Sequence, residues 1–271
     1  MPSRTSKTEP PLPTVNMLWI GEGLGPIERL SITSFLRIGH PVHLHAYTPL
    51  NNVPVGTVLC DANDTVPWSK AGELQYANGS YALASNYFRY ALQAQGKGIW
   101  CDADLVCLKP LEIAGDHLFA WEDEIKVNCG VFYLQQDHPL LRELFDLYET
   151  EPIPPWAEMN VLRRWIARRR AQISGKPLGR YLPWGAYGVN AFNTLSKKYP
   201  FTPMPSTTFY SLPWRQAHRL VDPHEKLEDL LAPDSRALHL WHEVLRREGL
   251  LKERPPATSP LAELYRRYGI A

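Results

Sequence analysis

The sequence predicts an α/β fold in which helices flank one mixed, mainly parallel central sheet. VNMLWIG at 15–21 is a continuous apolar run, typical of a strand buried on both faces. A helical pattern follows at 26–38, and PVHLHAY at 41–47 then alternates as a second strand would. Strand, helix and strand in such close succession form a βαβ unit, which indicates a parallel sheet.

The elements can be assigned in order along the chain. Pro26 suits the first turn of the first helix, and Gly39 suits its end. Residues 48–72 are rich in Pro, Asn and Asp and are predicted to be a loop. We expect later helices at 81–95, 138–149, 157–172 and 187–199, strands at 98–101, 117–124 and 127–135, and a strand that becomes a helix over 237–249.

Length and composition are those of an ordinary globular protein. The 271 residues are 44% hydrophobic and 21% charged, which suits one large domain, expected over 15–271. Residues 1–14 lack the apolar region of a secretory signal and are expected to be a disordered leader. The net charge of +1 provides no general attraction for nucleic acid, so no nucleic-acid partner is expected. The four cysteines have no zinc spacing and are interpreted as reduced thiols.

Two aspartates follow the strand at 98–101. Asp102 and Asp104 are separated by Ala103 alone, and carboxylates this close repel each other and are costly away from water. Ligands of open α/β sheets bind outside the carboxyl ends of the strands. Carboxylate oxygens suit Mn²⁺ or Mg²⁺ and leave positions for phosphate oxygens. We therefore expect a metal site here, with a pair of surface carboxylates in a turn as the alternative.

The helix before this strand carries polar residues on one face. Ser85, Asn86 and Arg89 are three or four residues apart, so they share that face. Arg89 is suited to bind a carboxylate or a diphosphate through two hydrogen bonds. An ordinary surface arginine is the alternative.

SFLRIGHPVHLHAY (34–47) and ASNYFRYALQAQGKGIWCDADLVCLKPL (84–111) resemble glycosyltransferases with a DXD sugar-binding region. That group includes α-1,6-mannosyltransferases, α-1,4-galactosyltransferases and bacterial capsule or lipopolysaccharide glycosyltransferases. The resemblance is clear over 16–136 and thinner up to about residue 250. It implies a GT-A, Rossmann-like fold, with a nucleotide-sugar and metal-binding part at 15–136 and an acceptor-side part at 137–271.

The resemblance also implies the chemistry. A retaining hexosyltransferase would use a UDP- or GDP-linked sugar and a glycan, glycolipid or protein acceptor. Asp102 would contact the ribose or the metal, and Asp104 would hold the metal against the diphosphate. A late histidine often returns to the cation in such enzymes, and His239 in HLWHEVLRR is our choice, with a core histidine as the alternative. His242 and Glu243 lack the second histidine of a zinc protease motif.

Two positions depart from the family pattern. Asn86 stands where an aspartate is usual, and Lys97 precedes Gly98 where two glycines are usual. Asparagine keeps a hydrogen bond to sugar hydroxyls but loses a charge. These departures favour the main alternative, a catalytically weak nucleotide-sugar or glycan binding protein. A sugar nucleotidyltransferase ranks third, because GEGLGPIER (21–29) has a glutamate and a proline where that class carries basic residues in its loop.

Further residues are predicted to contact the donor. Gly21 opens a glycine-rich loop after the first strand, but Pro26 replaces the third glycine of a dinucleotide fingerprint. The backbone at Gly21 can still approach a nucleoside closely, and Tyr47 can stack on the base or pack in the core. Asn128 is a candidate for binding sugar hydroxyls, with a turn asparagine as the alternative. Glu122 and Asp123 precede it and suit either the sugar or a solvated turn. WGAYGVN (184–190) resembles the acceptor-side loop of the same family, with Gly188 and Val189 in place of Gly-Pro.

A strongly basic helix is predicted at 156–171. It carries five arginines, interleaved with Trp165 and Ile166. Two interpretations are open: a solvated helix face, and attraction to an anionic membrane surface or a phosphorylated lipid acceptor. Because the sequence shows no signal anchor, we expect a cytoplasmic protein, with peripheral contact to the inner membrane face under the second interpretation.

Overall fold

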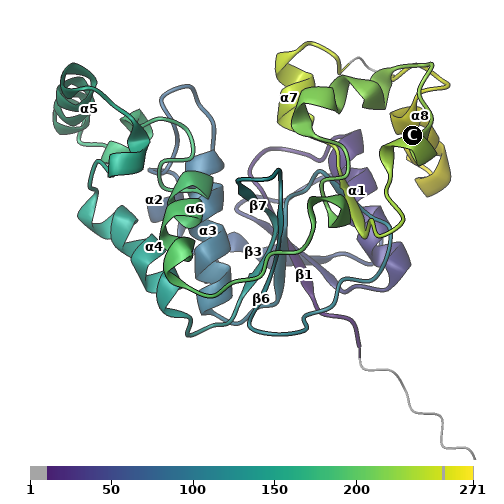
Figure 1. Cartoon of the computed structure of the whole chain (residues 1–271), viewed down its shortest axis with the longest axis horizontal. Coiled ribbons are helices and arrows are strands. Elements are labelled where there is room, and N and C mark those ends of the chain that lie inside the picture. Colours follow the sequence, from purple (N-terminus) through teal and green to yellow (C-terminus); the bar gives the residue numbers. More distant parts are fainter. Residues whose placement is uncertain (1–10, 252–253, 271) are drawn as a thin grey trace, which may run out of the picture.

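The computed structural model describes residues 11–251 and 254–270 and has an α/β architecture. Its central six-stranded sheet has the order β3-β2-β1-β4-β7-β6, and a second sheet pairs β5 with β8 (Figure 1). The central strands are β1 (Val15–Trp19), β2 (Val42–Ala46), β3 (Val58–Asp61), β4 (Ile99–Cys101), β6 (His117–Trp121) and β7 (Val127–Leu134). The second sheet consists of β5 (Leu105–Cys107) and β8 (Ala237–His239).

The central sheet is mainly parallel, as predicted. β1 pairs in parallel with β2 and β4, and β2 pairs in parallel with β3. β7 is antiparallel to both of its neighbours, β4 and β6, so it alone runs against the other strands. The carboxyl ends of β1, β2 and β4 therefore meet at one edge of the sheet.

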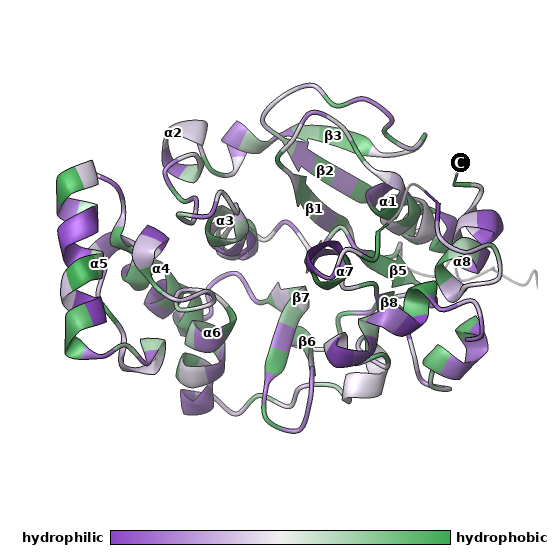
Figure 2. Ribbon diagram, turned by 90° about the horizontal axis from the view of Figure 1, so that it is seen from above, coloured by the Kyte–Doolittle hydropathy of each residue, from purple (hydrophilic) through white to green (hydrophobic). Residues whose placement is uncertain are grey.

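Two hydrophobic cores lie on opposite faces of this sheet (Figure 1). One is built on α1 (Pro26–Ile38), α7 (His242–Arg247) and α8 (Pro260–Tyr268) together with the small sheet. The other is built on α2 (Trp68–Ala71), α3 (Ala82–Ala94), α4 (Pro139–Thr150) and α6 (Val189–Leu195). Helix α5 (Val161–Ser174) lies beyond this second group (Figure 2).

Most elements begin and end within a few residues of the predicted bounds, and the exceptions have physical reasons. The segment 48–72 was wrongly predicted as loop throughout, because it contains β3 and α2. Strand β3 lies at the sheet edge, where Val58 and Leu59 are 47% and 53% exposed, and its four residues are too few to show a clear strand pattern within a Pro- and Asn-rich segment. Strand β5 and helix α8 were not predicted at all. The helix expected at 157–172 starts later, at Val161, because the Asn160 side chain caps it by accepting a hydrogen bond from Arg163 N.

The expected leader has one part that the structure describes. Residues 1–10 lie outside the described residues, whereas Pro13 and Thr14 contact the domain: the Pro13 carbonyl lies 2.9 Å from His40 Nδ1, and Ile99 N donates to the Thr14 carbonyl. In the part of the chain that the structure describes, no helix has both the length and the apolar character needed to cross a bilayer.

Candidate metal centre

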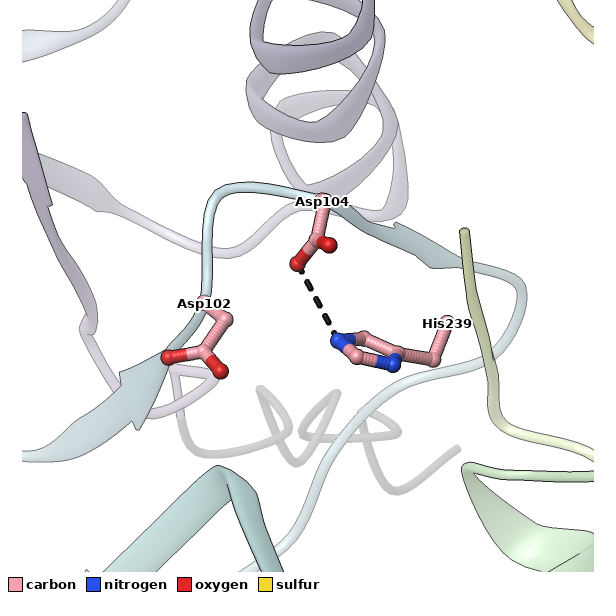
Figure 3. Close-up of side chains that lie close together, drawn as sticks. All are labelled: Asp102, Asp104 and His239. Carbon is pink, nitrogen blue, oxygen red and sulfur yellow. Dashed lines mark ion pairs between the residues drawn. The ribbon is translucent and has the colours of Figure 1, made fainter. Parts of the chain in front are cut away.

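Asp102, Asp104 and His239 come together at the carboxyl edge of the sheet (Figure 3). The two aspartates lie between the end of β4 and the start of β5, and His239 is the last residue of β8. Pairing of β5 with β8 sets Leu105 opposite His239, and Leu240 N donates to the Asp104 carbonyl at 2.8 Å. One potential ligand atom from each of the three side chains lies within 4.8 Å of the others.

His239 is held in one orientation by its neighbours. Its Nε2 lies 3.1 Å from Asp104 Oδ1, and its side chain is 8% exposed. The ring packs edge-on against Trp241, with 4.0 Å between the ring centroids. Its Nδ1 is buried and has no hydrogen-bond partner among the described residues. Nε2 therefore faces the two acids, as a ligand nitrogen would.

Asp102 has one oxygen in use and one available. Its Oδ1 accepts hydrogen bonds from Arg89 Nη2 and from Trp100 Nε1, both at 2.8 Å. No protein hydrogen bond reaches Oδ2 within the described residues. Arg89, itself 6% exposed, also lies over the Trp100 ring at 5.0 Å. Arg89 thus binds a carboxylate, one of the two partners predicted for it, but through one hydrogen bond and not the two expected.

The two carboxylates are electrostatically unequal. Burial raises the pKa of Asp102; Arg89 opposes that rise and Asp104 adds to it. Burial also acts to raise the pKa of Asp104, but the neighbouring His239 and the backbone amide of His242 outweigh it and lower this pKa to about 2. Asp104 is therefore a carboxylate at neutral pH.

His242 and Glu28 form a chain of contacts to Asp104 that the sequence did not predict. His242 N donates to Asp104 Oδ2 at 3.0 Å, and His242 Nδ1 lies 2.8 Å from Glu28 Oε1. Glu28 lies in the first turn of α1 with its side chain 2% exposed. Burial opposes a charge on His242, but the contact with Glu28 outweighs burial and raises the pKa of the histidine. In sequence, Glu28 is indistinguishable from any acid in a first helical turn.

Asn128 lies next to the acids through a glycine. The Asp102 amide donates to the Gly130 carbonyl at 2.7 Å, and a Cβ on Gly130 would lie 3.3 Å from Asp102 Oδ2 and 3.1 Å from Asn128 Oδ1. Asn128 Nδ2 donates to Glu122 Oε2 at 2.5 Å, so Glu122 belongs to this group. Asp123 is exposed and accepts the amides of Ile125 and Lys126, which is the turn interpretation.

Asn86 connects α3 to the start of α6. Its Oδ1 accepts a hydrogen bond from Arg89 Nη1 at 3.3 Å. A Cβ on Gly188 would lie 2.2 Å from Asn86 Nδ2, so only a glycine fits there without movement. The predicted acceptor-side loop at Gly188 therefore reaches the group around Arg89.

The remaining residues predicted to bind the nucleotide-sugar form no hydrogen bond with Asp102, Asp104 or His239 among the described residues. Gly21 is exposed just beyond β1, and Tyr47 follows β2, both at the carboxyl edge. The Tyr47 hydroxyl donates to the Val66 carbonyl at 2.9 Å and the ring packs on Trp68, so the residue is partly structural. Burial, with a smaller effect of Asp61, raises the pKa of Tyr47 to about 12. Ser85 is half-buried and makes no side-chain hydrogen bond to any described residue.

Lys97, the second departure from the family pattern, is not at this site. Its Nζ donates to Thr65 Oγ1 at 2.8 Å, at the opposite end of β4 from the aspartates. The neighbouring Gly98 has φ of +103°, and a Cβ there would lie 2.6 Å from the Thr14 carbonyl oxygen.

Two clefts of about 310 and 300 Å³ lie elsewhere. The first is lined by residues of β6 and the segment 202–204, and the second lies between α3, α4 and residues 65–70. Neither cleft is lined by Asp102, Asp104 or His239. The candidate centre is therefore identified by the metal-ligating side chains that it brings together, and not by the volume of a cleft.

The chain matches no known protein-family model and no curated protein. The geometry of Asp102, Asp104 and His239 is therefore the basis for inferring a function.

Proposed function

We propose that the chain is a metal-dependent GT-A glycosyltransferase that moves a hexose from a UDP- or GDP-linked donor to an acceptor hydroxyl of a glycan, glycolipid or protein. One observation carries the proposal. Asp102, Asp104 and His239, from distant parts of the sequence, converge where a mainly parallel sheet presents the carboxyl ends of its strands.

The donor set fits Mn²⁺ or Mg²⁺. Asp102 Oδ2, Asp104 Oδ1 and His239 Nε2 are the atoms that would hold the ion, and Mn²⁺ accepts imidazole more readily than Mg²⁺ does. A bound cation supplies Lewis-acid stabilisation of the negative charge that develops on the leaving diphosphate. Arg89 holds Asp102 through Oδ1 and so orients Oδ2.

Residues around the two aspartates would bind the sugar and the nucleoside of the donor. Asn128, oriented by Glu122, would bind hydroxyls of the transferred sugar. Gly21 and Tyr47 would contact the nucleoside at the same edge of the sheet. The bond from the anomeric carbon to the diphosphate breaks through an oxocarbenium-like state, and the acceptor oxygen bonds to the same face. The acceptor proton passes to the departing phosphate oxygen, so retention requires no protein nucleophile.

A catalytically weak binding protein is the second candidate. Asn86 supports it, because this position contributes a neutral amide beside Arg89 where the resembling family has a carboxylate. Lys97 gives it no support, since its ammonium bonds Thr65 away from the site.

A panel of UDP- and GDP-sugars, assayed for nucleotide release with and without Mn²⁺, tests the proposal. We expect cation-dependent release from at least one donor. Asp104→Asn should lower that rate by about 100-fold or more, because it removes a ligand charge. Asp146→Asn, at an exposed position on α4, is the matched control and should retain the rate. Unchanged release by Asp104→Asn contradicts the metal site, whereas donor binding with no release for any sugar supports the binding protein.

A further inference from the structure

Helix α5 exposes its large apolar side chains instead of packing them. Ala167 is its only buried residue among those described, and Arg164, Ile166 and Ala171 are half-buried. The exposed fractions of the large apolar residues are 84% for Val161, 64% for Leu162, 62% for Trp165 and 72% for Ile173. A solvated helix ordinarily shows polar side chains to water and apolar ones to the core, so this orientation is inverted.

The helical register explains the inversion. Arg164, Ala167 and Ala171 are three to four residues apart and form the face toward the protein, where Arg164 Nε donates to the Met159 carbonyl at 2.8 Å. Leu162, Trp165 and Ile173 fall on the opposite face. They form what we call the outer stripe of α5. Trp165 therefore does not pack in the core.

The charges of α5 are all positive and lack acidic partners. The helix contains Arg163, Arg164, Arg168, Arg169 and Arg170 and no aspartate or glutamate. None of these arginines forms an ion pair with a carboxylate of the described residues. Arg163, Arg168, Arg169 and Arg170 are exposed, and their guanidinium groups are available to anions, whereas Arg164 faces the protein.

The helix also lies where a flat surface could reach it. In Figure 1, α5 projects at the end of the molecule farthest from α8, and its ribbon alternates between hydrophilic and hydrophobic bands in Figure 2. Fourteen residues make a helix about 21 Å long, too short and too basic to span a bilayer but suited to lie along its surface.

We propose that α5 binds the interface of an anionic lipid bilayer, with the outer stripe among the acyl chains and the arginines at lipid phosphates. Tryptophan at the stripe and arginine beside it match the polarity gradient of that interface. Charge complementarity favours an anionic over a neutral surface by about fivefold in binding for each arginine that reaches it. This inference stands independently of the proposed transferase activity.

Vesicle co-sedimentation of the full chain tests it, with phosphatidylcholine vesicles compared with vesicles that also contain phosphatidylglycerol. We expect binding to the anionic vesicles, weakened by added salt. Reversal of two charges, R168E with R169E, should weaken binding about 30-fold or more. L162S with W165S should weaken it at least about tenfold while leaving its salt dependence.

R142E with K197E changes the net charge equally at exposed positions away from α5 and should bind as the unchanged protein does. Circular dichroism should show that every variant folds, since all altered side chains are exposed. Three outcomes overturn the proposal: no binding to anionic vesicles, equal loss in R142E with K197E, or a lipid-free dimer that the α5 variants abolish, which would assign the stripe to a second copy of the chain.

Discussion

Asp102 uses one of its two oxygens for hydrogen bonds within the protein. Oδ1 accepts hydrogen bonds from Arg89 and the Trp100 indole, while Oδ2 accepts none from the described residues. The Asp102 side chain lies beside Asp104 and His239 (Figure 3). Removing water from Arg89 is unfavourable unless its charge is paired, and Asp102 supplies that pairing. The same contact therefore stabilises the fold and sets the direction of a candidate metal ligand.

Replacing Arg89 by Met should lower the free energy of unfolding by about 3 kcal/mol, because the Asp102 carboxylate is left without its cation. Asp102→Asn in the same chain should recover part of that loss, since a neutral amide no longer needs the cation. Urea unfolding of the two single variants and the double variant measures the coupling. Additive losses would show that the pair contributes nothing beyond its separate groups.

At the scale of elements, short segments assemble the centre. Strand β5 has only three residues, yet its pairing with β8 places His239 beside Asp104. The start of α6 places Gly188 against Asn86, and α7 turns the His242 amide toward Asp104. Each contact joins segments far apart in the chain, so the centre exists only when both cores have formed.

Gly188→Ala should destabilise the protein by about 1–3 kcal/mol and disturb the site, because its Cβ would lie 2.2 Å from Asn86 Nδ2. Adding Asn86→Ala removes the atoms in conflict and should restore part of the stability. Gly115→Ala is the matched control, as a Cβ there meets nothing within 4 Å. Thermal unfolding of the variants compares them. Equal stability of the two alanine variants would show that α6 adjusts freely.

At the scale of the whole molecule, buried polar groups in the sheet connect its two cores. His45 of β2 lies 2.9 Å through Nε2 from Asn16 Oδ1 of β1, and its ring packs against Phe88 of α3. Burial, then Lys97 and His43, lower the pKa of His45 to about 4 from the ordinary 6.5. Between pH 6.5 and about 4, this histidine is therefore neutral in the folded protein and protonated in the unfolded chain.

Because the unfolded chain binds the extra proton between pH 6.5 and about 4, stability should fall as pH falls through that window. His45 alone accounts for a loss on the order of 3 kcal/mol. His45→Gln, which keeps a donor for Asn16, should make the loss between pH 7 and 4.5 about 2 kcal/mol smaller in urea unfolding. His218→Gln, at an exposed histidine, serves as the control. An unaltered pH dependence in His45→Gln would assign the effect to other groups.

Local patterns in the sequence determined the βαβ opening, most helices, the parallel character of the sheet and the position of Asp102 and Asp104 at a strand end. These follow from periodicity and from turn residues, which act over a few positions. The prediction that His239, and not His242, lies beside the two aspartates agrees with the structure. His242 instead donates its backbone amide to Asp104.

Only the tertiary structure decided the pairing of β5 with β8, the contact between Glu28 and His242, the fit of Gly188 over Asn86, and the outward direction of the α5 apolar stripe. Local composition does not distinguish an edge strand from a loop, a three-residue strand from a turn, or a solvent-facing tryptophan from a buried one. Their state is set by what packs against them, and those partners are distant in the chain.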